Sequence, residues 1–181
     1  MNNLAELVAY KLDDPNTIQN EWKNLINNKS NFKFDARSYV SLDFFTDYFQ
    51  KIINDVTGLI GQYKNIVIQC HDKLLHDEKW HLNVVHKDAE RLSCVTIPIS
   101  YNPAETVNFY NQNMLDRGTS PNRKADQRLA YSLAHPSLIN VSNYHNVRVL
   151  DDTSPRILLQ LSYDIDFNEF VSKNPDYWVI K

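Results

Sequence analysis

Four residues carry side chains that could form a reactive site: His86, Asp88, His145 and Arg156. One residue separates His86 from Asp88, and Arg156 follows eleven residues after His145. Two imidazoles and one carboxylate on one face of a metal ion leave its other positions open, which is typical of non-heme Fe(II) centres that activate O2. A fixed guanidinium nearby suits a co-substrate that carries a carboxylate. The sequence therefore predicts three metal ligands and one anion-binding residue.

The His-x-Asp triplet needs support from its context, because six histidines and 22 acidic residues generate such triplets by chance. His76 and Glu78 have the same spacing, but they lie in a charged stretch that is typical of a solvated turn or helix. His86 and Asp88 instead end the strand-like run 80–85, where alternation directs both side chains to the same side. We therefore expect His86 and Asp88 to be the ligands.

His145 and Arg156 lie in two consecutive β-rich runs, 144–150 and 156–163. Joined by the turn 151–155, these strands would place the two side chains next to each other. His145 could instead be a core imidazole that is satisfied by hydrogen bonding. The Arg156 guanidinium, near an apolar sheet interior, needs a partner, which is either a bound carboxylate or a neighbouring acidic residue such as Asp88.

The order and placement of these residues resemble the Fe(II)/2-oxoglutarate-dependent dioxygenase superfamily over residues 80–166. The resemblance implies that His86, Asp88 and His145 bind Fe(II), and that Arg156 pairs with the distal carboxylate of 2-oxoglutarate. In that family, O2 and 2-oxoglutarate are consumed together, with release of succinate and CO2. The usual result is hydroxylation of a substrate C–H bond.

The chain departs from the family pattern two residues after the arginine, where many members carry serine and this sequence has Leu158. Another group must then complete the co-substrate site. Thr96, on the predicted strand 92–99, is a candidate, as are Asn108 and Tyr110 on the next predicted strand, and each is also consistent with a purely structural role. Arg91, three residues after Asp88, either orients that carboxylate or is exposed.

The hydrophobic pattern predicts one mostly β domain with N-terminal helices. At 181 residues and 43% hydrophobic content, the chain is long enough for one substantial core. Apolar residues recur every three or four positions over 15–26 and 42–60, which predicts helices. Short runs rich in β-forming residues predict strands at 65–70, 80–87, 92–99, 105–110, 137–142, 144–150 and 156–163.

These elements, with the resemblance, favour a double-stranded β-helix, or jelly roll, with supporting helices. Residues 1–64 would be the helical support, 65–166 the jelly-roll core and 167–181 a C-terminal extension within a single domain, 1–181. Another β-sandwich with added helices would give the same composition. Strand periodicity is lost over 112–134, an insertion that would be a substrate lid with a cationic rim or a solvated surface segment.

Composition excludes several classes of protein. A net charge of −3 gives no case for nucleic acid as the main partner. No run of 18 apolar residues exists and the N-terminus lacks a signal peptide, so we expect no membrane association and a cytoplasmic location. Cys70 and Cys94 lie in apolar runs and are expected to be small buried residues. Three glycines leave no Gly-rich phosphate loop.

Three functions remain open at this stage. The favoured one is a dioxygenase that hydroxylates a small-molecule or peptidyl substrate. The second is a cupin-type metal-binding protein with isomerase or lyase activity, which would use the same three ligands without 2-oxoglutarate and would not need Arg156. The third is a non-catalytic β-sandwich binding module in which the histidines are incidental. The sequence predicts neither the identity of the substrate nor the oligomeric state.

Overall fold

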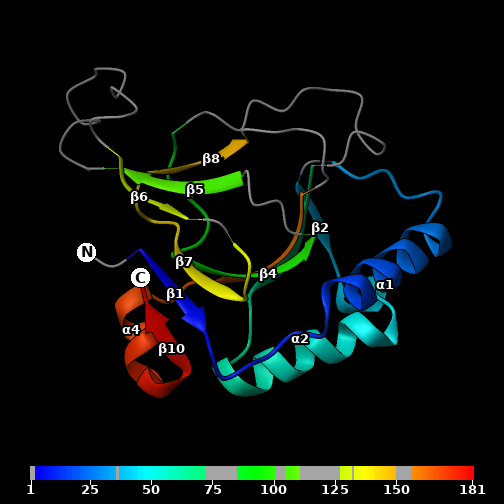
Figure 1. Ribbon diagram of the computed structural model, residues 1–181, viewed down its shortest axis with the longest axis horizontal. Helices are drawn as coiled ribbons and strands as arrows, with labels where there is room; N and C mark the ends of the chain where they lie inside the picture. Colours follow the sequence, from blue (N-terminus) through cyan, green and yellow to red (C-terminus); the bar gives the residue numbers. More distant parts are fainter. Residues whose placement is uncertain are drawn as a thin grey trace.

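The computed structural model describes residues 3–35, 37–71, 85–100, 105–110, 127–131, 133–149 and 156–181. Within these ranges the protein is mostly β, with two antiparallel sheets and with helices on one side (Figure 1). None of the described helices is both long and apolar enough to cross a bilayer.

The larger sheet has seven antiparallel strands. Two adjacent strands in its middle, residues 93–100 and 156–163, are buried over their whole length. Such strands need cover on both faces, which the helices and the smaller sheet provide. The strand order is β10 (Trp178–Ile180), β1 (Leu4–Leu7), β7 (Ser137–Asn140), β4 (Ser93–Ser100), β9 (Arg156–Tyr163), β3 (Asn65–His71) and β2 (Arg37–Val40).

The smaller sheet has three strands in the order β6 (Gln127–Tyr131), β5 (Glu105–Tyr110) and β8 (His145–Val149). It packs on one face of the larger sheet through a buried apolar cluster that includes Phe109 and Leu158. We call the face of the larger sheet that meets the smaller sheet the inner face, and the opposite face the outer face.

Two amphipathic helices cover the outer face (Figure 1). Helix α1 (Pro15–Asn28) begins where the Asp14 carboxylate accepts hydrogen bonds from two backbone N–H groups of the first turn. Helix α2 (Asp47–Ile60) ends at Gly61, whose φ of 100° is accessible mainly to glycine. Their apolar stripes pack on the outer face to form the main core, which also includes residues of α4 (Phe167–Lys173).

The predicted helices are confirmed, with one change of boundary. Residues 15–26 lie in α1, but the helix predicted over 42–60 begins only at Asp47. Before it, Leu42–Phe44 forms a short 3-10 turn (η1), and Phe45 and Thr46 have extended backbone. The apolar spacing continues across this break, and this is why the pattern alone did not reveal it.

Six of the seven predicted strands are confirmed to within two residues, as β3, β4, β5, β7, β8 and β9. Of the seventh, predicted over 80–87, only residues 85–87 are described. There His86 forms an isolated antiparallel bridge with His145 instead of a full strand.

Four described strands lie outside the seven predicted runs. β1 and β2 lie in the region expected to be helical support, β6 lies within the expected insertion 112–134, and β10 lies in the C-terminal extension, beyond another 3-10 turn, η2 (Pro175–Tyr177). Each has three to five residues and pairs with a strand distant in sequence, as β1 does with β7 and β10. Such strands are stabilised by their partners and not by their own pattern. Residues 112–126 lie outside the described part of the chain.

Candidate metal centre

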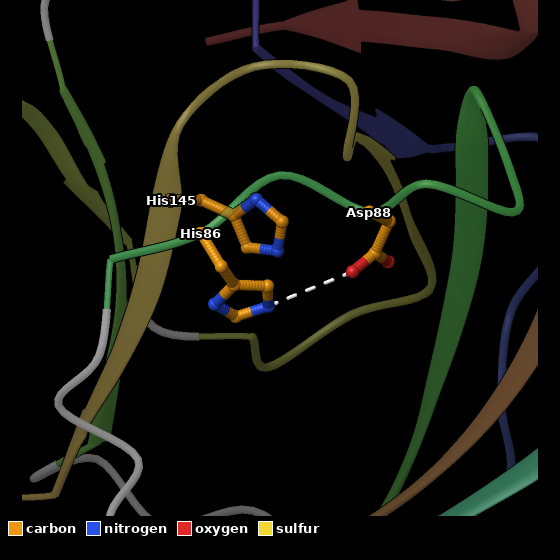
Figure 2. A group of neighbouring side chains, drawn as sticks. All are labelled: His86, Asp88 and His145. Atoms are coloured by element: carbon orange, nitrogen blue, oxygen red, sulfur yellow. Dashed lines mark ion pairs between the residues drawn. The ribbon is translucent and has the colours of Figure 1, made fainter. Parts of the chain in front are cut away.

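The three predicted ligands meet at one point. The donor atoms of His86, Asp88 and His145 all lie within 4.8 Å of one another, and Figure 2 shows the side chains converging. Nε2 of His86 is 3.5 Å from Oδ1 of Asp88, and the two imidazole centroids are 4.5 Å apart. Bonds of about 2 Å to a metal place neighbouring donors about 3 Å apart, so small side-chain rotations would bring all three to one ion.

Backbone pairing fixes the relative positions of these residues. His86 and His145 exchange two backbone N–H···O hydrogen bonds of 2.9 Å, and the N–H of Asp88 donates to the carbonyl of Val141 at 3.0 Å. Residues 86–88 therefore run antiparallel to 141–145, beside the edge of β8. The spacing of two places His86 and Asp88 on the same side, as predicted.

His145 is oriented as a metal ligand through its second ring nitrogen. Nδ1 lies 2.9 Å from the carbonyl oxygen of Asn143, which can only accept, so Nδ1 carries the proton and Nε2 keeps its lone pair. Burial lowers the pKa of His145 to about 4, and the imidazole is therefore neutral at pH 7. The Asn143 side chain donates to Oδ1 of Asn3 at 2.5 Å, which fastens this turn to the N-terminal segment.

Asp88 is held by Arg91. Nε of Arg91 donates to Oδ2 of Asp88 at 2.6 Å, while Oδ1 faces His86. Burial by itself would raise the pKa of Asp88, but the charge and the hydrogen bond of Arg91 outweigh it and lower that pKa below its ordinary value. The carboxylate is thus ionised at neutral pH and presents one oxygen to the centre. Arg91 is 8% exposed, so it is an orienting partner and not a surface residue.

A chain of hydrogen bonds connects this carboxylate to the predicted anion-binding residue. Nη1 of Arg91 donates to Oε1 of Gln160 at 3.2 Å, and Nε2 of Gln160 donates to Oε1 of Gln69 at 3.2 Å. The same Gln69 oxygen accepts from Nη1 of Arg156 at 3.1 Å. Arg156 is 4% exposed. The network runs across the inner face of β9 and β3 and spans from Asp88 to Arg156.

The prediction that the strands of His145 and Arg156 lie side by side is wrong. β8 belongs to the smaller sheet, and β9 lies between β4 and β3 in the larger one. The two residues therefore come from opposite layers of the sandwich. The predicted turn 151–155 and its two aspartates lie outside the described residues.

The predicted co-substrate contacts lie in different sheets, Thr96 in the larger one and Asn108 and Tyr110 in the smaller one. Thr96 lies on the inner face of β4, in register with Gln160, and its hydroxyl donates to the carbonyl of Ser137 at 3.1 Å. Tyr110 follows Phe109, an inward residue, and its hydroxyl donates to Oδ1 of Asn146 at 3.0 Å. Strand alternation therefore places Tyr110 on the face of the smaller sheet that points away from the centre.

Sequence reasoning missed the two glutamines of the network. For Gln160 a signal was present, since Gln160 and Ser162 are the polar residues in a strand whose other residues after Arg156 are Ile, Leu and Tyr. Gln69 similarly interrupts the apolar run of β3. Leu158, the family departure, occupies the position between Arg156 and Gln160 and packs in the inner apolar cluster.

Two other sequence expectations can be placed in the structure. Cys70 and Cys94 are both fully buried, as predicted, and they lie in the outer and inner clusters respectively. The competing pair, His76 and Glu78, lies outside the described residues.

Comparison with protein-family models and with curated protein sequences finds no match. Among solved structures, the chain is similar to the crystal structure of IDO from Bacillus thuringiensis, with 12% identity and a TM-score of 0.41. The alignment covers 81% of this chain and 84% of the other. A likeness this distant carries no weight for fold or function.

Proposed function

We propose that the protein is an Fe(II)/2-oxoglutarate-dependent dioxygenase that hydroxylates a small-molecule or peptidyl substrate. The observation that carries the proposal is the convergence of His86, Asp88 and His145 at one end of a polar network whose other end is Arg156. Iron in such a site, with 2-oxoglutarate and O2, supplies the oxidising power for C–H hydroxylation and releases succinate and CO2.

The donor set suits Fe(II). His145 offers a neutral Nε2, and Asp88 offers one oxygen because Arg91 occupies the other. The His86 side chain is 45% exposed, so the centre has a side that small molecules can approach. Two nitrogens and one oxygen leave further coordination positions for a chelating co-substrate and O2.

Arg156 would hold the distal carboxylate of 2-oxoglutarate. Its planar guanidinium matches a carboxylate in shape and charge, and burial strengthens such a contact. The hydrogen bonds through Gln69 and Gln160 fix the spacing between this guanidinium and Asp88, which a ligand that contacts both ends requires. Thr96, in register with Gln160, would supply the polar contact that Leu158 lacks.

We further propose that the sandwich is a jelly roll. Between β3 and β9, the described segments are β3, the bridge segment at His86, β4, β5, β6, β7, β8 and β9. They pair as nested partners: β3 with β9, the bridge segment with β8, β4 with β7, and β5 with β6. This nesting is the pattern of a long hairpin rolled over itself, which supports the jelly-roll assignment.

Two other functions use part of the same geometry. A cupin-type isomerase or lyase would need the three ligands but would give no role to Arg156. A non-catalytic binding module would need neither the three ligands nor Arg156, and for such a module we expect no tight binding of iron. Formation of succinate from 2-oxoglutarate, with Fe(II) and O2 supplied, distinguishes the dioxygenase from both.

The decisive experiment is an anaerobic titration of Fe(II)-loaded protein with 2-oxoglutarate, followed by the visible metal-to-ligand charge-transfer band. We expect the band in the wild type and its loss in His86→Ala. Arg156→Ala should weaken 2-oxoglutarate binding by about 10- to 100-fold while iron still binds, because a charge-assisted contact contributes roughly 1.5–3 kcal/mol. Lys51→Ala, which removes an exposed cation on α2, is the control. An unchanged affinity in the Arg156 variant would contradict the assignment of the co-substrate site.

A further inference from the structure

A pocket of about 340 Å³ adjoins the candidate metal centre. His86 and Asp88 form part of its wall, so the pocket borders two of the three proposed ligands. Arg37 and Tyr39 of the edge strand β2 and Ser162 of β9 are among the other lining residues. Its volume is at the lower end of the range for small-molecule sites, which suits a ligand of about amino-acid size.

Arg37 is the unusual residue of this pocket. Its Nε is buried and has no hydrogen-bond partner among the residues that the structure describes. Its Nη2 lies 3.9 Å from Oδ2 of Asp88, beyond hydrogen-bond distance, whereas Arg91 donates to that same oxygen at 2.6 Å. The charge of Asp88 is thus already balanced by Arg91. A buried guanidinium N–H without an acceptor is costly, and an anion in the pocket would remove that cost.

The charges around the pocket favour an anionic ligand. Its wall contains three cationic side chains, those of Arg37, Lys87 and Arg91. It contains two carboxylates, those of Asp88 and Glu90. Arg91 pairs with Asp88, so two cations, Arg37 and Lys87, stand against the one remaining carboxylate, Glu90. Arg37 and Lys87 therefore leave a positive potential in the pocket.

We propose that this pocket binds a carboxylate group of the prime substrate and that Arg37 is the residue that recognises it. The substrate is then a small acid or an acidic side chain. A carboxylate on Arg37 would place its neighbouring carbon atoms beside Asp88 and His86, on the side where the proposed iron has open positions. The inference rests on the proposed function, because carbon atoms placed beside the proposed iron are a substrate only if the centre is that of an oxygenase.

The test uses protein loaded with Mn(II) and saturated with 2-oxoglutarate, without O2, so that no turnover occurs. The probes are N-acetylaspartate N-methylamide and its uncharged match, N-acetylasparagine N-methylamide. Broadening of their proton NMR lines by Mn(II) measures both binding and proximity to the metal, and Zn(II)-loaded protein gives the diamagnetic reference. We expect strong broadening of the acid, and binding of the amide that is about 10- to 100-fold weaker, as expected for loss of a charge-assisted contact.

Three variants locate the effect. Arg37→Gln should reduce acid binding to the level of the amide while 2-oxoglutarate affinity stays unchanged, which also shows that the variant is folded. Arg37→Lys should retain part of the binding, because it keeps the charge but loses the planar fork. Lys51→Gln makes the same change of charge on the exposed side of α2 and should have no effect.

The proposal is overturned if the acid and the amide are broadened equally, or if Arg37→Gln binds the acid as the wild type does. These outcomes leave the dioxygenase assignment intact, provided that Mn(II) and 2-oxoglutarate bind. If the metal does not bind to the wild type, the proposed function fails and this inference fails with it.

Discussion

The two faces of the seven-stranded sheet differ sharply although they share the same strands. On the outer face, Val95 and Leu161 are register partners beneath the helices. One residue further along β4, Thr96 is in register with Gln160 on the inner face, and Gln160 belongs to the polar network. The outer face is a continuous apolar core, whereas the inner face combines a small apolar cluster with buried charges. The main apolar core and the candidate site are thus separated by the alternation of side chains along each strand.

The buried polar network of the inner face is tolerated because its members are hydrogen-bonded to one another. Buried charges and amides cost free energy unless they are hydrogen-bonded, and the chain from Asp88 through Arg91 and Gln160 supplies such bonds. The outer face has no such requirement, since most of its side chains are apolar. Changes on the two faces should therefore have different consequences, and this can be measured.

The largest effect is expected for Asp88→Ala. The change removes a proposed metal ligand and leaves Arg91 buried without its carboxylate, so Fe(II) binding should be lost and the free energy of unfolding should fall by about 3–5 kcal/mol. Chemical denaturation and anaerobic Fe(II) titration measure the two losses. The double variant Asp88→Ala/Arg91→Met should recover most of the stability and none of the iron binding. Recovery of both would show that Asp88 is not a ligand.

On the outer face, Phe49→Ala should affect stability alone. Phe49 of α2 is 1% exposed and packs edge-on against Trp22, so its truncation should cost about 3–5 kcal/mol. The affinity of the folded variant for Mn(II) should be unchanged, as measured by electron paramagnetic resonance under conditions in which the protein is folded. Ile53→Val, a smaller change in the same core, should cost about 0.5–1.5 kcal/mol. A weakened Mn(II) affinity in either variant would mean that the two faces are coupled.

The smallest effect is expected for Tyr110→Phe. Its hydroxyl donates to Asn146 on the far side of the smaller sheet, so removal should cost about 1 kcal/mol of stability. The affinity for 2-oxoglutarate should not change, in contrast to Thr96→Val, which alters a residue in register with the network. A lower affinity in the Tyr110 variant alone would restore this tyrosine as a co-substrate contact and would contradict the placement argued from strand alternation.

Sequence reasoning located the metal-ligand candidates because their information is local. His86 and Asp88 are adjacent on an extended segment, and the alternation that puts them on one side is a property of any such segment. His145 and Arg156 were identified from their order along the chain, but the strand arrangement assumed for them was wrong. Whether two consecutive strands pair or enter different sheets depends on pairing with distant strands, as β9 pairs with β3 and β4.

The same reason explains which parts of the fold were not predicted. α1 and α2 each carry an apolar stripe, so they could be predicted directly from the sequence. β1 and β6 are short strands that are stabilised by partner strands elsewhere in the chain. The role of Arg37 was equally hidden, because β2 was not recognised as a strand and only the paired sheet brings this residue to Asp88.

The isolated backbone bridge between His86 and His145 belongs to neither named sheet, so we expect it to open and close locally. Two amide protons close this bridge, and their opening would pull the two imidazoles apart while both sheets stay intact. Hydrogen–deuterium exchange at these two amides should then slow markedly when a metal ion spans the rings. These two amides would thus report occupancy of the proposed metal centre, without any catalytic assay.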